Sequence, residues 1–146
     1  MPRVIVVDDH AVIRRGVQGI LHPFPEWELC GEAQDGREAI RLAETVKPEI
    51  IIMDVSMPGL NGLEATRIIR NILPDTKILL LTLHSSTELV RSAFRAGARG
   101  YVLKSDAEQE LVRALNVLAG DGTYVSPGID QHIAKQAIVE ETRAPN

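Results

Sequence analysis

The sequence predicts an α/β fold in which helices cover both faces of a parallel sheet. Two observations lead to this prediction. Short apolar runs recur along the chain, and the segments between them carry apolar residues at helical spacing. Strands that alternate with helices form a parallel sheet with right-handed crossovers, which distribute the helices over both faces.

Five apolar runs are the candidate strands. The first, third and fourth are continuous runs of Ile, Val, Leu and Met, without alternating polar residues. A strand that is covered on both faces has this pattern, as in a parallel sheet. The five runs are Val4–Val7, Trp27–Cys30, Ile50–Met53, Ile78–Leu81 and Tyr101–Leu103.

Helices are predicted between the strands. Three segments space their apolar residues by three and four positions, which gathers these side chains on one helix face. The segments are Ile13, Val17, Ile20 and Leu21; Ala65, Ile68, Ile69 and Ile72; and Leu111, Leu115, Leu118 and Ala119. Breaks that contain proline end the first three helices, at His22–Pro25, Lys47–Pro48 and Leu73–Asp75.

The absence of a Gly-rich loop after the first strand indicates the order of the strands. Two orders are common for doubly wound sheets, and the dinucleotide-binding one needs a Gly-rich loop after the first strand. The residues after Val7 contain no such loop. The sequence therefore predicts a flavodoxin-like (βα)5 doubly wound parallel sheet with strand order 2-1-3-4-5.

Composition narrows the class of protein. With 45% hydrophobic and 25% charged residues, the chain resembles an ordinary globular domain with an aliphatic core. The net charge of −4 argues against a nucleic-acid-binding surface in this segment. Cys30 has no partner for a disulfide or a metal clip. Because no signal peptide or membrane span is recognisable, we expect a cytoplasmic protein without membrane contact.

The residue pattern of the chain changes near its end. Residues 1–122 are predicted to form one domain, and residues 123–146 to form a linker with a short helix. Gly122–Gly128 is rich in turn-forming residues, whereas Ile129–Val139 carries apolar residues at helical spacing. We expect no second domain within this chain.

Polar residues end four of the five strands. Parallel strands deliver their carboxyl ends to one edge of the sheet, where ligands bind. Asp8 and Asp9 follow the first strand, Asp54 the third, Thr82 the fourth and Lys104 the fifth. Strands one and three are neighbours in the predicted order, so three carboxylates converge on one pocket.

Taken singly, each of these residues has a simpler explanation. Asp9 is a plausible helix N-cap, and Asp54 a plausible turn residue before Pro58-Gly59. Thr82 and Lys104 are common strand and surface residues. Their convergence is what favours a functional site, because clustered carboxylates repel one another unless a cation lies among them.

Mg²⁺ suits such a cluster, since it prefers carboxylate oxygens, waters and phosphate oxygens. The histidines His10, His22, His84 and His132 are scattered, so they do not indicate zinc, although His10 and His84 are expected near the pocket. A carboxylate, Mg²⁺ and lysine together form a site for phosphoryl transfer, with Asp54 as nucleophile. Gly59 and Gly62 are expected to keep the following loop open around the phosphate.

These residues resemble the receiver domains of two-component response regulators. The resemblance covers about residues 2–121, and it is closest to the NarL/FixJ (LuxR-type) group through VVDDH, DVSMPGLNGLEATR and GARGYVLKSD. It implies a sensor histidine kinase as phosphoryl donor and Asp54 as acceptor. It further implies that the backbone carbonyl of Ser56 binds the metal together with Asp8, Asp9 and Asp54.

The resemblance also implies how the signal is passed on. Thr82 and Tyr101 match the family's switch pair, in which the hydroxyl moves toward the phosphate and the aromatic ring turns inward. The expected output is homodimerisation and control of transcription through a helix-turn-helix domain. That domain would follow Asn146 in a longer protein, because no such segment lies within this chain; a stand-alone regulator is the alternative.

Two other functions compete with a signalling switch that catalyses only its own phosphorylation and dephosphorylation. A phosphohydrolase of the haloacid dehalogenase kind also uses an aspartyl nucleophile, but it needs an acid where Ser56 stands, and a cap domain. A flavodoxin-like redox carrier needs a phosphate-binding loop and aromatic residues to stack on the flavin. Aromatic residues make up only 3% of this chain.

Overall fold

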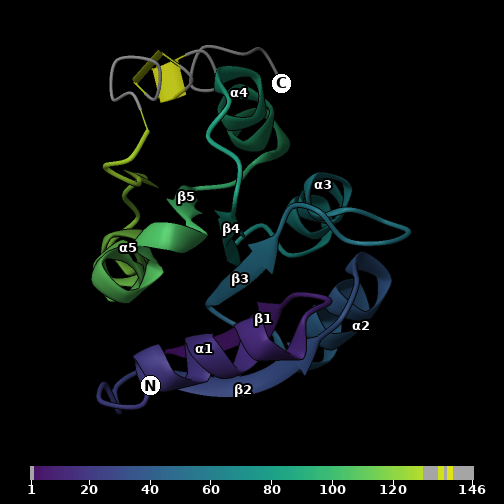
Figure 1. The fold of residues 1–146 in the computed structure, drawn as a ribbon. Helices are drawn as coiled ribbons and strands as arrows, with labels where there is room; N and C mark the ends of the chain where they lie inside the picture. The colour runs from purple at the N-terminus through teal and green to yellow at the C-terminus, as the bar shows by residue number, and fades with distance from the viewer. Residues whose placement is uncertain (1, 130–134, 137, 140–146) are drawn as a thin grey trace.

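The computed structural model is a six-stranded, all-parallel sheet with helices on both faces (Figure 1). It describes residues 2–129, 135–136 and 138–139. The strands are β1 (Arg3–Val7), β2 (Glu28–Ala33), β3 (Ile50–Asp54), β4 (Lys77–Thr82), β5 (Gly100–Leu103) and β6 (Tyr124–Val125). The helices are α1 (Ala11–Leu21), α2 (Gly36–Val46), α3 (Gly62–Ile72), α4 (Thr87–Ala96), the 3₁₀ helix η1 (Lys104–Asp106) and α5 (Ala107–Ala119).

The strand order is β2-β1-β3-β4-β5-β6, which confirms the predicted order of the first five strands. Strand β6 was not predicted. It lies in the stretch that was expected to contain only turns, and it pairs with β5 through two residues. A strand this short has no periodicity to detect, because its existence depends on the neighbouring edge rather than on its own sequence.

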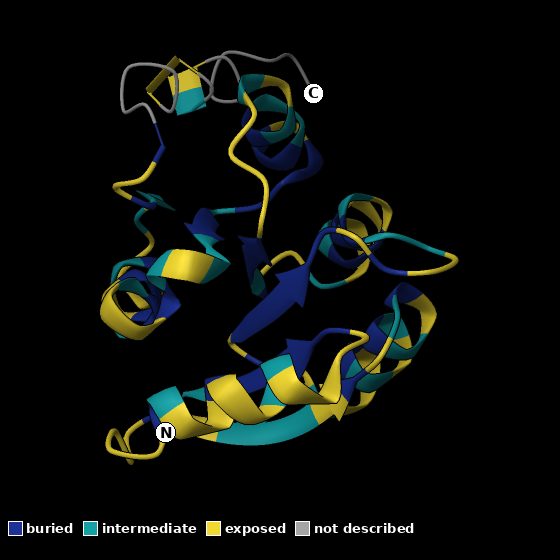
Figure 2. Ribbon diagram, in the orientation of Figure 1, coloured by how far each residue is buried: buried dark blue, intermediate teal, exposed yellow. Residues whose placement is uncertain are grey.

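Two cores flank the sheet because successive strand residues point to opposite faces. In β1, Val4 and Val6 pack in the core beneath α1 and α5, whereas Ile5 and Val7 pack in the core beneath α2, α3 and α4. Figure 2 shows the result: the central strands are buried, and the outward helix faces are exposed. This double burial explains why the strand sequences are continuous apolar runs.

The second strand differs most from its prediction. It begins at Glu28 and continues to Ala33, beyond the predicted Trp27–Cys30. Trp27 instead precedes the strand and is buried in the core beneath α1 and α5. Strand β2 lies at the edge of the sheet, so its polar residues Glu28 and Glu32 are tolerated on the solvent side.

The predicted helix within Ile129–Val139 lies largely outside the described residues. Within the part of the chain that the structure describes, none of the helices combines the length and apolar character that a membrane crossing requires.

Candidate phosphoacceptor and metal site

The register of the central strands places the predicted acids side by side. Strands β1 and β3 are neighbours, and Val7 pairs with Met53. Asp8 directly follows Val7, and Asp54 directly follows Met53, so both residues emerge at the carboxyl edge of the sheet. Both side chains are buried, with exposures of 1% for Asp8 and 4% for Asp54, whereas Asp9 is exposed.

The side chains of Asp8, Asp9, His10 and Asp54 form one cluster. One ligand atom from each lies within 4.8 Å of those of the other three. The structure therefore brings together the three carboxylates that the sequence predicted to converge. Their oxygens are the donor type that Mg²⁺ prefers, and their spacing fits a single cation. The metal contact expected from the backbone carbonyl of Ser56 stays a prediction.

His10 belongs to this cluster, although the sequence predicted it only near the edge of the pocket. Its backbone N–H donates to Oδ1 of Asp8 over 2.9 Å. Its ring Nδ1 lies 3.2 Å from Oδ1 of Asp8 and 3.2 Å from Oδ1 of Asp9. His10 is also the N-cap residue of α1, without a side-chain capping bond, so Asp9 does not fill that simpler role.

Lys104 places a positive charge beside the two buried acids of the site. Its Nζ lies 3.0 Å from Oδ2 of Asp8 and 3.4 Å from Oδ1 of Asp54. The residue begins η1 directly after β5, and its side chain reaches across the edge of the sheet to the acids. The ammonium thereby offsets part of the repulsion between two buried carboxylates.

The environment of Asp54 disfavours its ionised form. Burial raises the pKa of the Asp54 carboxyl above its usual value, and the neighbouring Asp8 carboxylate raises it further. Lys104 and the backbone N–H of Ser56, which donates to Oδ1 over 3.3 Å, lower the pKa but only partly compensate. A buried carboxylate with a raised pKa beside a cation is a typical feature of a reactive site.

Thr82 and Tyr101 meet at the loop between β4 and α4. The Thr82 hydroxyl accepts a hydrogen bond of 3.1 Å from the backbone N–H of His84. The Tyr101 hydroxyl donates to the carbonyl of His84 over 2.6 Å. Burial raises the pKa of Tyr101, and a hydrogen bond with the Thr82 side chain partly opposes this shift. The backbone of His84 thus joins the two residues of the predicted switch pair.

The ring of Tyr101 is fully buried. The side chain therefore faces the interior in this structure, and the switch role of Tyr101 stays a prediction. The ring packs in the core that contains Phe94 of α4 and Ile129 beyond β6. No sequence pattern signals this packing, because Ile129 lies 28 positions further along the chain.

The loop after Asp54 combines an open and a crowded glycine. Gly59 has a φ of +72° and open space around it, which agrees with a freely shaped loop. Gly62 was expected to act in the same way, and this interpretation is wrong. A Cβ on Gly62 would lie 2.1 Å from the Asp54 carbonyl oxygen, so Gly62 permits close packing rather than openness. The loop ends at Asn61, the N-cap residue of α3, which forms a capping box with Glu64 in the first turn of the helix.

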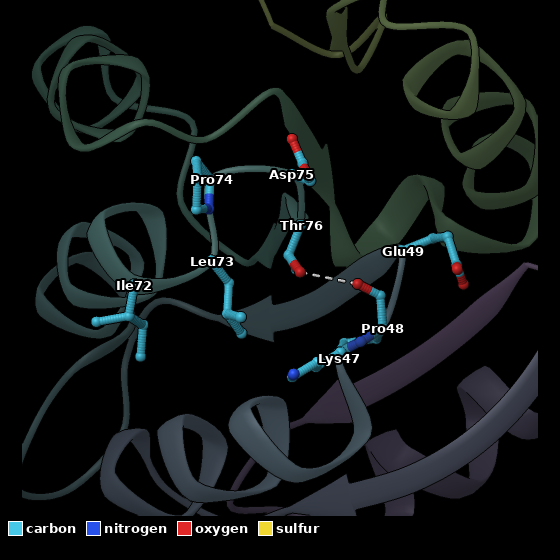
Figure 3. A pocket seen from close by; sticks show the side chains of 8 residues that line it. All are labelled: Lys47, Pro48, Glu49, Ile72, Leu73, Pro74, Asp75 and Thr76. Carbon is cyan, nitrogen blue, oxygen red and sulfur yellow. Dashed lines mark hydrogen bonds between the residues drawn. The ribbon is translucent and has the colours of Figure 1, made fainter.

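A separate pocket lies at the opposite edge of the sheet (Figure 3). It encloses about 260 Å³ between the loops that lead into β3 and β4, and the hydroxyl of Thr76 donates to the carbonyl of Pro48 across it over 2.8 Å. It contains none of the acids described above, so it is not part of the candidate site. Its lining residues are Lys47, Pro48, Glu49, Ile72, Leu73, Pro74, Asp75 and Thr76.

Comparisons with known proteins agree with this geometry. The family model described as "Response regulator receiver domain" matches residues 4–116. The response regulator UvrY of Escherichia coli strain K12 is 38% identical over 146 residues, which is 99% of this chain and 67% of UvrY. The transcriptional regulatory protein DegU of Brevibacillus brevis is 37% identical over 134 residues, covering 92% of this chain and 57% of DegU.

Solved structures give the same result. A two-component response regulator of the LuxR family from Aurantimonas sp. SI85-9A1 has a TM-score of 0.85 at 36% identity, covering 99% of both chains. The receiver domain of the putative response regulator NarL from Mycobacterium tuberculosis has a TM-score of 0.77 at 34% identity, covering 82% of this chain and 96% of that one. The chain spans only 57% and 64% of the length of two of its curated relatives. The matched family model and these relatives show that the chain belongs to the response regulator receiver domains, with relatives of the LuxR and NarL type.

Proposed function

We propose that this chain is a signalling switch in which Asp54 accepts a phosphoryl group from a sensor histidine kinase. The observation that supports this most directly is the setting of Asp54. Its buried carboxylate lies beside Asp8 and 3.4 Å from the ammonium of Lys104. Asp54 is thus the only one of the three acids that is both buried and at the end of a strand itself.

Asp8, Asp9 and Asp54, with the backbone carbonyl of Ser56, would hold Mg²⁺. When bound, the cation neutralises charge on the transferred group. One Oδ of Asp54 forms the new bond to phosphorus. With acetyl phosphate as donor, the bond between phosphorus and the acetyl oxygen breaks and acetate leaves with the electron pair, so no proton is transferred. Lys104 pairs with the oxygens of the attached phosphoryl group, and Thr82 donates a hydrogen bond to one of them.

The proposal extends to the output. We propose that residues 1–122 are the receiver and residues 123–146 a linker to a DNA-binding domain outside this chain. Relatives described as transcriptional regulatory proteins support this arrangement. Phosphorylation would favour a homodimer in the cytoplasm and thereby control transcription. The chain itself would act on no substrate other than its own Asp54.

Intact-protein mass spectrometry tests the proposal. After incubation with acetyl phosphate and Mg²⁺, the chain gains one phosphoryl group. Asp54→Asn and chelation of the metal each prevent the gain. Asp75→Asn, which changes an exposed acid at the opposite edge of the sheet, is the matched control and leaves it intact.

Two results would overturn the proposal. One is equal labelling of the Asp54→Asn variant, which would place the acceptor elsewhere. The other is continuous hydrolysis of an unactivated phosphate ester by the unmodified protein, which would favour the phosphohydrolase alternative.

A further inference from the structure

Strand β6 binds directly to the strand that carries Tyr101. The backbone N–H of Tyr124 donates to the carbonyl of Arg99 over 3.0 Å, and that of Ser126 donates to the carbonyl of Tyr101 over 2.9 Å. In Figure 1 the yellow-green segment that follows α5 passes beside β5, with which it pairs. The edge of β5 is therefore occupied by the start of the predicted linker.

Side chains fasten this segment in addition to the backbone. Ser126 is fully buried, and its hydroxyl donates to the carboxylate of Asp106. The hydroxyl of Tyr124 donates to Glu110 on α5. Beyond the strand, the N–H of Ile129 donates to the carbonyl of Ser126 over 3.0 Å, and Ile129 is buried in the same core as Tyr101.

The helix η1 connects this segment to the candidate site. Lys104, its first residue, contacts Asp8 and Asp54. Asp106, its last residue, holds Ser126. The two residues belong to one 3₁₀ turn, which therefore contacts both the candidate site and the docked segment. The buried Tyr101 lies on β5, directly beside this segment.

We propose that residues 124–129 form a latch that docks this chain's own linker on the edge of β5, and that phosphorylation of Asp54 loosens it. The inference rests on the proposed function. The phosphoryl group on Asp54 carries a charge of about −1.5 to −2, which replaces the single charge of the carboxylate, and Lys104 pairs with it in place of Asp8. The shift of Lys104 draws η1 toward the site and pulls Asp106 away from Ser126. The edge of β5 that β6 had covered then becomes accessible, and the linker can move relative to the receiver.

Hydrogen–deuterium exchange of the full chain tests the latch, with intact mass measured on the same samples. Phosphorylation by acetyl phosphate and Mg²⁺ is expected to accelerate exchange of the Tyr124 and Ser126 amides about tenfold, as expected when one net hydrogen bond is lost. Ser126→Ala is expected to give similar acceleration without phosphorylation. Ser105→Ala, an exposed serine of the same 3₁₀ turn, is the matched control and leaves exchange unchanged.

The two measurements separate the two proposals. If the mass increases by one phosphoryl group while residues 124–129 keep their protection, the latch is wrong and the proposed function stands. If no phosphoryl group is gained, the proposed function fails and the latch fails with it. Unchanged exchange in Ser126→Ala, with the protein still folded by circular dichroism, would also overturn the latch.

Discussion

The ammonium of Lys104 lies 3.4 Å from a carboxylate oxygen of Asp54, although β4 separates the strands that lead to these two residues. The same nitrogen lies 3.0 Å from Asp8, one strand further away. The long lysine side chain thus spans the carboxyl edge of the sheet. One cation is placed where it can pair with the acids before phosphorylation and with a phosphoryl group afterwards.

Replacing Lys104 separates metal binding from signalling. In Lys104→Ala the acids remain, so Mg²⁺ binding is expected to persist, whereas the conformational response to phosphorylation is expected to disappear. Mg²⁺ affinity is measured by calorimetric titration, and the response by hydrogen exchange of β5 and η1. Lys77→Ala is the control, because Lys77 pairs with the exposed Asp121 over 2.7 Å, away from the acids. An intact response in Lys104→Ala would remove Lys104 from the mechanism.

Neutralising Asp54 is expected to stabilise the metal-free fold at neutral pH. Because the folded-state pKa of Asp54 is raised, its contribution to stability is fully present below the usual value near 3.8 and is lost as the pH rises through the raised pKa. At pH 7 without metal, Asp54→Asn is expected to raise the melting temperature by a few degrees, the shift that about 1 kcal/mol produces in a domain of this size. The difference is expected to shrink below pH 4.

Asp121 is the control for this experiment, because its pKa is shifted in the direction opposite to that of Asp54. The pKa of Asp121 is lowered by its hydrogen bond and charge interaction with Lys77, so its contribution is present at neutral pH and is lost in acid. Since Asp121 is exposed, Asp121→Asn is expected to change the melting temperature little and never to raise it as Asp54→Asn does. A lower melting temperature for Asp54→Asn at pH 7 would contradict the electrostatic description of the site.

The fold and the acids were predictable from the sequence for a physical reason. Strands buried on both faces need continuous apolar runs, and the polar residues after Val7, Met53, Leu81 and Leu103 must then lie at one edge of the sheet. The position of His10 was harder to predict, because it depends on the turn between β1 and α1. Strand β6 and the burial of Tyr101 depend on contacts between distant segments, which leave no periodic signal in either one.

Gly62 is predicted to be essential for the packing of the loop after Asp54. In Gly62→Ala the new Cβ would meet the Asp54 carbonyl oxygen at 2.1 Å, so the backbone must shift, at a cost of about 1–3 kcal/mol in the free energy of unfolding. Urea denaturation measures this loss. Gly16→Ala in α1 is the control: nothing lies within 4 Å of the added Cβ, and alanine favours the helix by about 0.5–1 kcal/mol. A tolerated Gly62→Ala would show that the loop has more freedom than its contacts indicate.

Removing the Tyr101 hydroxyl tests the link between the switch pair and the loop before α4. Tyr101→Phe loses the 2.6 Å hydrogen bond to the His84 carbonyl, and the free energy of unfolding is expected to fall by about 1 kcal/mol at pH 7. The folded-state pKa of Tyr101 is raised, so the wild-type contribution is present below the usual value near 10 and is lost as the pH rises above it. The wild type and the variant should therefore converge in stability when urea denaturation is repeated above pH 10. A constant difference across this range would show that the hydroxyl is not held in the buried position that joins Tyr101 to His84.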